Sequence, residues 1–145
     1  MSEKERVTQI IRANYGVNKF VQLCGIVIDD VECGTVQLSM TIDSAKHTNM
    51  YSVVHGGALA SLGDTALGAA CASVGCRAVT VDYAVNFLRN IHAGDTAIAV
   101  GTVLKQGRSI IVVRVEIFNK DKVLLTEMQG TMFVTGPFED IPRKW

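Results

Sequence analysis

The order of apolar and polar residues divides the chain into two helical segments and two groups of strands. Apolar residues recur at helical spacing near the amino terminus, and Asn14 and Gly16 interrupt that pattern. We therefore expect one broken amphipathic helix over about residues 4–23. Strict alternation over residues 35–42 then predicts a half-buried strand, and residues 26–31 supply the strand before it.

The stretch from residue 55 to residue 74, HGGALASLGDTALGAACASV, is apolar or small on nearly every helical face. A helix of about twenty residues is roughly 30 Å long, which is enough to cross a membrane. However, the stretch has an aspartate at its centre, and nothing else in the chain resembles a second span. We expect instead a helix that is buried on most sides inside a folded domain.

Alternation with a period of two returns after this helix and continues almost to the carboxyl terminus. Short connections separate the runs, at residues 93–94, 106–107 and 119–122. Connections this short join antiparallel strands, because parallel strands need long crossovers. The four predicted strands cover about residues 79–88, 96–104, 109–118 and 123–134. Residues 136–145 are expected to form a surface extension.

This order of elements predicts an α+β domain. A strongly curved antiparallel sheet wrapped around the single long helix would bury that helix as its composition demands. One face of the sheet would remain for a partner. The length fits a single domain over residues 1–145, without repeats or linkers.

Composition narrows the classes of function. Fourteen basic residues balance fourteen acidic ones, so no basic surface for nucleic acid or for an anionic membrane is indicated. The cysteines lack the close pairs of a zinc site, and free thiols are expected at Cys24, Cys33, Cys71 and Cys76. The amino terminus mixes both charges and has no apolar core, so no signal peptide is predicted and a cytoplasmic location is expected.

Asp64 is the most informative residue. It is the only acidic residue between Asp43 and Asp82, and it stands in the middle of the apolar helix. Burying an unpaired carboxylate costs several kcal/mol, so a stranded acid of this kind is a candidate for function. The alternative is that Asp64 belongs to a solvated stripe of the helix with Ser61 and Thr65. Composition alone leaves the two alternatives open.

The motif His55-Gly56-Gly57 begins the same helix. Two glycines let a ligand approach the backbone closely, and the first N–H groups of a helix have no intrahelical partner. These donors and the helix dipole favour an anion or a developing oxyanion. Asn49, in the preceding loop, offers an amide that could orient a carbonyl or a water. Taken singly, Gly-Gly and a loop asparagine are more often only turn residues.

In combination, Asn49, His55-Gly56-Gly57 and Asp64 resemble the active-site signature of the hotdog-fold acyl-CoA thioesterases of the phenylacetate-pathway type. In that family an asparagine precedes a loop, the HGG motif, and an acid seven residues after the second glycine. Gly57 and Asp64 keep this interval. The resemblance extends to the stretches TVDYAVNFLRN and VLKQGRSIIVV, and it covers about residues 20–135.

The resemblance implies a hotdog fold and hydrolysis of an acyl-CoA thioester, with Asp64 as general base or as nucleophile. It also implies that the Gly57 N–H stabilises the oxyanion and that Asn49 polarises the carbonyl or holds the water. Thr80 would supply a hydroxyl near the carboxylate. His55 would brace the loop rather than carry protons.

The resemblance further implies a homodimer or a dimer of dimers, in which different subunits supply the acid and the HGG donors of one site. CoA would lie at the interface, against Gly56. Arg89, Lys105 and Arg108 are candidate contacts for its phosphates, although each is also readily explained as a solvated turn charge. The chain departs from the family at residues 50–52, where a glycine is common, so the acyl preference stays open.

No cofactor and no metal are expected, because the chain has no phosphate-binding loop, no dinucleotide-binding motif and no metal-ligand cluster. A GxSxG motif is also absent, which disfavours a serine hydrolase. The substrate itself, an acyl-CoA, is the only ligand implied. Aromatic, hydroxylated and medium-chain acyl groups would all need a small apolar pocket.

Two other functions stay open at this stage. A hydratase or dehydratase of the same fold would pair a histidine with an acid, but His55 lies about 14 Å along the helix from Asp64. Such a pair would need a second subunit. A non-catalytic acyl-CoA-binding regulator would resemble this domain fused to a DNA-binding module. Only about 25 residues precede the first predicted strand, which disfavours that module, and the presence of Asp64 favours catalysis.

Overall fold

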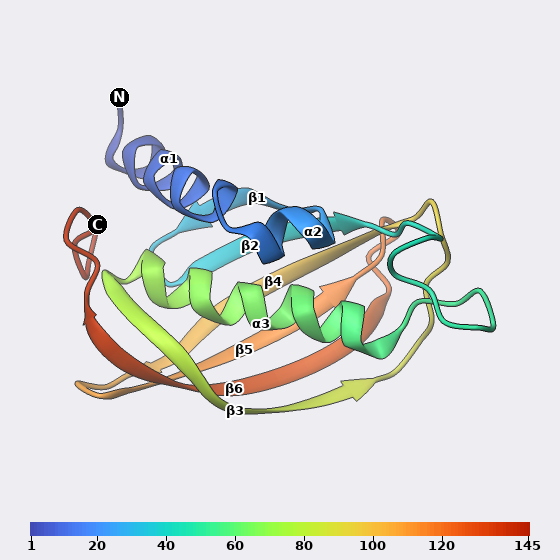
Figure 1. The fold of residues 1–145 in the computed structure, drawn as a ribbon. Helices are drawn as coiled ribbons and strands as arrows, with labels where there is room; N and C mark the ends of the chain where they lie inside the picture. Colours follow the sequence, from blue (N-terminus) through green and yellow to red (C-terminus); the bar gives the residue numbers. More distant parts are fainter.

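The computed structural model describes residues 1–145 and has a six-stranded antiparallel sheet curved around one long helix (Figure 1). Along the chain the elements are α1 Glu3–Gly16, α2 Lys19–Cys24, β1 Ile26–Glu32, β2 Thr35–Thr41, α3 Gly56–Ser73, β3 Cys76–Phe87, β4 Thr96–Gln106, β5 Ile110–Phe118 and β6 Leu124–Pro137. Across the sheet the order is β1-β2-β4-β5-β6-β3, and every neighbouring pair is antiparallel. The predicted α+β architecture is confirmed.

The long helix α3 lies in the concavity of the sheet, as its all-round apolar composition requires. Leu59, Leu62 and Leu67 are at most 1% exposed and belong to the single hydrophobic core. The helix approaches β6 closely at Gly130, where a Cβ atom would lie only 2.5 Å from a methyl group of Leu67. No helix of this structure combines the length and the hydropathy of a membrane span.

The expected broken helix near the amino terminus consists of two separate helices, α1 and α2. The first helix continues through Asn14 and ends at Gly16, the second of the two residues that interrupt the sequence pattern. The Asn18 side chain accepts hydrogen bonds from the N–H groups of Phe20 and Val21 and so begins α2. Both helices contact β1 and α3, and they cover that side of the core (Figure 1).

The carboxyl-terminal residues differ from the surface extension that we expected. Strand β6 continues to Pro137, and the next apolar side chains, Phe138 and Ile141, are 8% and 4% exposed. The Trp145 indole N–H donates a hydrogen bond to the Ser73 carbonyl at the end of α3, at 2.8 Å. Three apolar side chains without a regular spacing carry no periodic signal, so only tertiary contacts reveal that this segment packs on the core.

Strand β3 forms one edge of the sheet and pairs only with β6 (Figure 1). Its twelve residues are mostly exposed. The exposed side chains include large apolar ones, namely Val79, Val81, Tyr83 and Phe87. A long edge strand with unpaired N–H and C=O groups and apolar side chains is a template for pairing with another strand.

Candidate active site

Asp64 lies at the seam between α3 and β3. Its side chain is half-buried, so it is neither stranded in the core nor on a fully solvated stripe. The Thr80 hydroxyl on β3 donates a hydrogen bond to Asp64 Oδ1 at 2.7 Å. The fold therefore brings together two of the residues that the family resemblance named, sixteen positions apart in sequence.

Asp64 and Thr80 line a cavity of about 380 Å³ that the amino-terminal helices close on the other side. Tyr15 and Phe20 contribute from that side. The apolar part of the wall includes Val21, Ala78, Val79 and Met132, and the polar part includes Asn18 and Thr65. A cavity with one carboxylate, several hydroxyls and an apolar wall suits an uncharged group held beside the acid.

His55 begins α3 as its N-cap residue. Its Nδ1 atom accepts a hydrogen bond from the Gly57 N–H at 3.0 Å. The N–H that we expected to act as oxyanion donor is therefore held by the neighbouring imidazole, whereas the Gly56 N–H makes no hydrogen bond. A Cβ atom on Gly56 would lie 3.0 Å from the Phe87 ring, so glycine permits the close approach of β3 to the helix start.

Asp64 and the HGG motif are separated along α3. Asp64 follows Gly57 by seven residues, which corresponds to about 10 Å along the helix axis. An oxyanion donor must lie about 3 Å from the oxygen of the carbonyl group that is attacked. One chain therefore does not bring Gly57 and Asp64 to a common carbonyl.

Asn49 lies in the loop between β2 and α3 and shapes that loop. Its Oδ1 atom accepts hydrogen bonds from the N–H groups of Tyr51, at 2.8 Å, and Val53, at 3.4 Å. The Nδ2 group of Asn49 makes no hydrogen bond within the chain and is available as a donor to a ligand.

His47 fixes the same loop, and sequence reasoning missed it. The side chain is 5% exposed, its Nδ1 accepts from the Asp43 N–H at 2.9 Å, and its Nε2 lies 2.8 Å from the Cys24 carbonyl. Because Nδ1 accepts and a carbonyl cannot donate, Nε2 must carry the proton. A single histidine in a loop gives no periodic or motif signal that would have predicted this role.

The three candidate phosphate contacts lie at opposite ends of α3. Arg89 lies near the start of α3. Two residues after it, the Ile91 carbonyl accepts a hydrogen bond from the N–H group of Val54, which lies just before the helix. Lys105 and Arg108 belong to the β4–β5 hairpin, whose Gln106 donates to the Val74 carbonyl beyond the other end of α3. The 18 residues of α3 span about 27 Å. Within one chain, these cations cannot contact the same phosphate.

The described chain holds no cluster of three or more potential metal ligands. All four cysteines are free thiols, and Cys71 and Cys76 are buried. Burial, with a smaller contribution from nearby Cys76, raises the pKa of the Cys71 thiol to about 12. A thiol of this kind is a poor nucleophile at neutral pH.

The chain matches known proteins at the level of both sequence and structure. The model of the thioesterase superfamily matches residues 51–126. The acyl-coenzyme A thioesterase PaaI of Escherichia coli is 34% identical over 122 residues, which cover 84% of this chain and 86% of that protein. Human acyl-coenzyme A thioesterase 13 is 26% identical, with coverage of 82% and 86%. The predicted resemblance to thioesterases of the phenylacetate type is thereby confirmed.

Solved structures agree with this relationship. The structure of E. coli PaaI, from the phenylacetic acid degradation operon, superposes with a TM-score of 0.87 at 32% identity and covers 94% of this chain and 98% of that one. A Streptococcus mutans protein bound to acetyl CoA matches with a TM-score of 0.73 at 33% identity, covering 77% and 90%. A thioesterase from Streptococcus pneumoniae has been solved as two alanine mutants, one of an aspartate and one of a threonine. These two positions are separated by the same interval as Asp64 and Thr80.

Proposed function

Because the chain belongs to the thioesterase superfamily and is a thioester hydrolase, we propose that it cleaves acyl-CoA thioesters with Asp64 at a site shared between two subunits. The observation that carries this proposal is the position of the Asp64 carboxylate. It faces a cavity with both apolar and polar walls and accepts a hydrogen bond from the Thr80 hydroxyl at 2.7 Å. The equal spacing of the aspartate and the threonine mutated in the S. pneumoniae relative supports a joint role for these residues.

In the proposed reaction, Asp64 takes a proton from a water molecule while the water oxygen attacks the thioester carbon. The C–S bond breaks, the acyl group leaves as a carboxylic acid, and the CoA thiolate takes up a proton. The alternative is direct attack by Asp64, which forms a mixed anhydride that water then hydrolyses. Thr80 holds one carboxylate oxygen in both routes, and the Asn49 Nδ2 group is a candidate donor to the carbonyl or the water.

We further propose that Gly57 of a second subunit supplies the oxyanion donor, since Gly57 and Asp64 of one chain are about 10 Å apart along α3. Strand β3 offers a way to join the two halves. Thr80 lies beside Asp64, and Phe87 lies beside Gly56 on the same strand. If two copies of β3 pair antiparallel about a twofold axis between Tyr83 and Ala84, Thr80 pairs with Phe87 of the partner subunit.

This register would bring Asp64 of one subunit opposite the HGG motif of the other. It would also cover the exposed apolar side chains of β3 and satisfy its unpaired backbone groups. Arg89 follows Phe87 by two residues, so it is the candidate cation best positioned for a CoA phosphate at the same interface. A homodimer is then the smallest active unit.

The Gly57 N–H becomes available to the oxyanion only when His55 Nδ1 releases it. We propose that the substrate carbonyl oxygen replaces the imidazole as acceptor. The two acceptors compete for one donor, and the negative charge that develops on the oxygen during attack favours the carbonyl oxygen. In the absence of substrate, His55 then accepts the hydrogen bond of the Gly57 N–H, and it does not transfer a proton.

The test is a thiol-release screen over a panel of acyl-CoAs, run with the wild-type protein and Asp64→Asn. The variant is expected to keep its oligomeric state in size-exclusion chromatography. Its rate of thiol release should fall about 10²- to 10⁴-fold. Asp121→Asn, in the exposed β5–β6 turn, is the matched control and should keep full activity. Near-normal turnover by Asp64→Asn contradicts the proposal. So does hydration of an enoyl-CoA, or tight acyl-CoA binding by the wild type without thiol release.

A further inference from the structure

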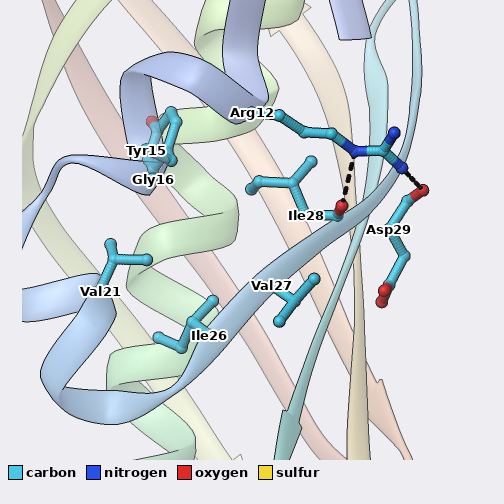
Figure 2. Close-up of a pocket in the computed structure, with 8 residues that line it drawn as sticks. All are labelled: Arg12, Tyr15, Gly16, Val21, Ile26, Val27, Ile28 and Asp29. Carbon is cyan, nitrogen blue, oxygen red and sulfur yellow. Dashed lines mark hydrogen bonds between the residues drawn. The ribbon is translucent and has the colours of Figure 1, made fainter. Parts of the chain in front are cut away.

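Tyr15, near the end of α1, presents its hydroxyl to the backbone of α3 next to the proposed site. Figure 2 shows its ring beside Gly16, where the helix ends. A Cβ atom on Gly68 would lie 2.9 Å from Tyr15 Oη, so the hydroxyl lies directly over Gly68 and uses the space that a side chain would fill. Gly68 follows Asp64 by one helical turn, about 6 Å along the axis.

The Tyr15 hydroxyl has no hydrogen-bond partner within the chain, although its ring is partly buried. Burial, followed by the nearby Cys71 and Asp64, raises the pKa of Tyr15, so the phenol stays protonated and remains a donor. The hydroxyl is not one of the fully buried unpaired polar atoms of the chain, so it stays accessible from the cavity. A ligand oxygen that enters the cavity can therefore accept a hydrogen bond from it in place of solvent.

The space around Tyr15 connects to the Asp64 cavity. A second cavity of about 140 Å³ shares Tyr15, Gly68 and Ala78 with the cavity that holds Asp64. Tyr15 therefore stands at the junction of the two. An acyl group whose thioester carbon lies at Asp64 and which extends along α3 meets the hydroxyl several atoms beyond that carbon.

We propose that Tyr15 is a specificity-determining residue that donates a hydrogen bond to a neutral oxygen in the distal part of the acyl group. The preferred substrates are then acyl-CoAs that carry a hydroxyl or keto group several atoms beyond the thioester. A carboxylate at this position would be repelled by the charge of Asp64. This inference rests on the proposed thioesterase site at Asp64.

The test compares hexanoyl-CoA with 4-oxo-, 5-oxo- and 6-hydroxyhexanoyl-CoA in the thiol-release assay, with the release in the absence of enzyme subtracted. For the wild type, at least one of the oxygen-bearing substrates should have a higher kcat/KM than hexanoyl-CoA. Tyr15→Phe should reduce that preference about five- to tenfold, the effect of one hydrogen bond, because it lowers kcat/KM more for the oxygen-bearing substrates than for hexanoyl-CoA, and it should leave the Tm nearly unchanged. A merely structural role of Tyr15 would lower the rates with all four substrates alike.

Two further variants sharpen the test. Thr65→Val removes a hydroxyl of the same cavity that already donates to the Ser61 carbonyl at 2.8 Å, so it should keep the preference. Gly68→Ala keeps the phenol but displaces it, and should reduce the preference as Tyr15→Phe does. If the wild type hydrolyses hexanoyl-CoA but its preference is absent, or is the same in Tyr15→Phe, the inference about Tyr15 fails alone. If no thiol is released from any of the four, the proposed function fails with it.

Discussion

The Thr80 hydroxyl donates a hydrogen bond to Asp64 Oδ1 at 2.7 Å and so links the edge strand β3 to the middle of α3. This link joins the proposed catalytic acid to the strand that we expect to form the dimer. Without the hydroxyl, the carboxylate would keep its charge but lose its fixed orientation. The orientation of the proposed catalytic acid therefore depends on a residue of the strand proposed to form the dimer interface.

Thr80→Val should lower kcat about tenfold to a hundredfold, because a misoriented carboxylate attacks or activates water less often in a productive geometry. Thr80→Ser keeps the hydroxyl and should restore most of the activity. Thiol release measures the rates, and thermal unfolding checks that both variants fold. Wild-type kcat in Thr80→Val would show that the hydrogen bond does not orient the acid.

Hybrid dimers should show that two subunits share each site. Asp64→Asn and Gly57→Pro, which removes the N–H, should each be nearly inactive alone. When the two variants are unfolded and refolded together, about a quarter of wild-type activity should return, because half of the dimers are hybrids with one intact site. If both groups of a site came from one chain, the mixture would stay inactive.

His47→Ala should destabilise the protein by roughly 2–4 kcal/mol, since it leaves the Cys24 carbonyl and the Asp43 N–H without partners. Urea unfolding measures the free energy. His92→Ala is the matched control, because the His92 side chain is exposed and should contribute little. Equal stability of the two variants would contradict the role of His47 in fixing the loop that carries Asn49.

Gly75→Ala should weaken the packing of the carboxyl-terminal segment, residues 138–145, against the core. Gly75 has φ +72°, and a Cβ atom there would lie 2.5 Å from the backbone oxygen of Ile141. Gly25 has φ +74° with no atom near such a Cβ, so Gly25→Ala should cost only about 1–2 kcal/mol of backbone strain. Gly75→Ala should cost more and shift the fluorescence of Trp145, the only tryptophan, to longer wavelength. Equal effects of both changes would mean that the segment adapts freely.

The buried thiol of Cys71 should resist alkylation by iodoacetamide in the folded protein at neutral and mildly alkaline pH. The pKa of Cys71 is raised to about 12 by burial, so the reactive thiolate forms only when the pH approaches that value. Half-buried Cys33 should react first, and Cys71 only after denaturation. Mass spectrometry of the labelled peptides would distinguish the two sites, and rapid labelling of native Cys71 would contradict its burial.

The order of elements and the architecture can be predicted from the amino-acid sequence. Strict alternation in the strands and an all-round apolar stretch at residues 55–74 allow few arrangements other than a curved sheet around a buried helix. The interval between Gly57 and Asp64, together with Asn49, also indicates the thioesterase family from the sequence alone. Alternation, helical spacing and motif intervals involve only residues that are close together in the chain, so they can be recognised without knowing the fold.

Which side chains contact one another across the elements could not be predicted from the sequence and is seen only in the folded chain. The hydrogen bond of Thr80 to Asp64 and the position of Tyr15 over Gly68 depend on how α1, α3 and β3 pack. Contacts between elements distant in the chain depend on packing and close approach, and hydrophobic periodicity does not encode them. For the same reason, the burial of Phe138 and Ile141 and the separation of Arg89 from Lys105 and Arg108 became visible only in the folded chain.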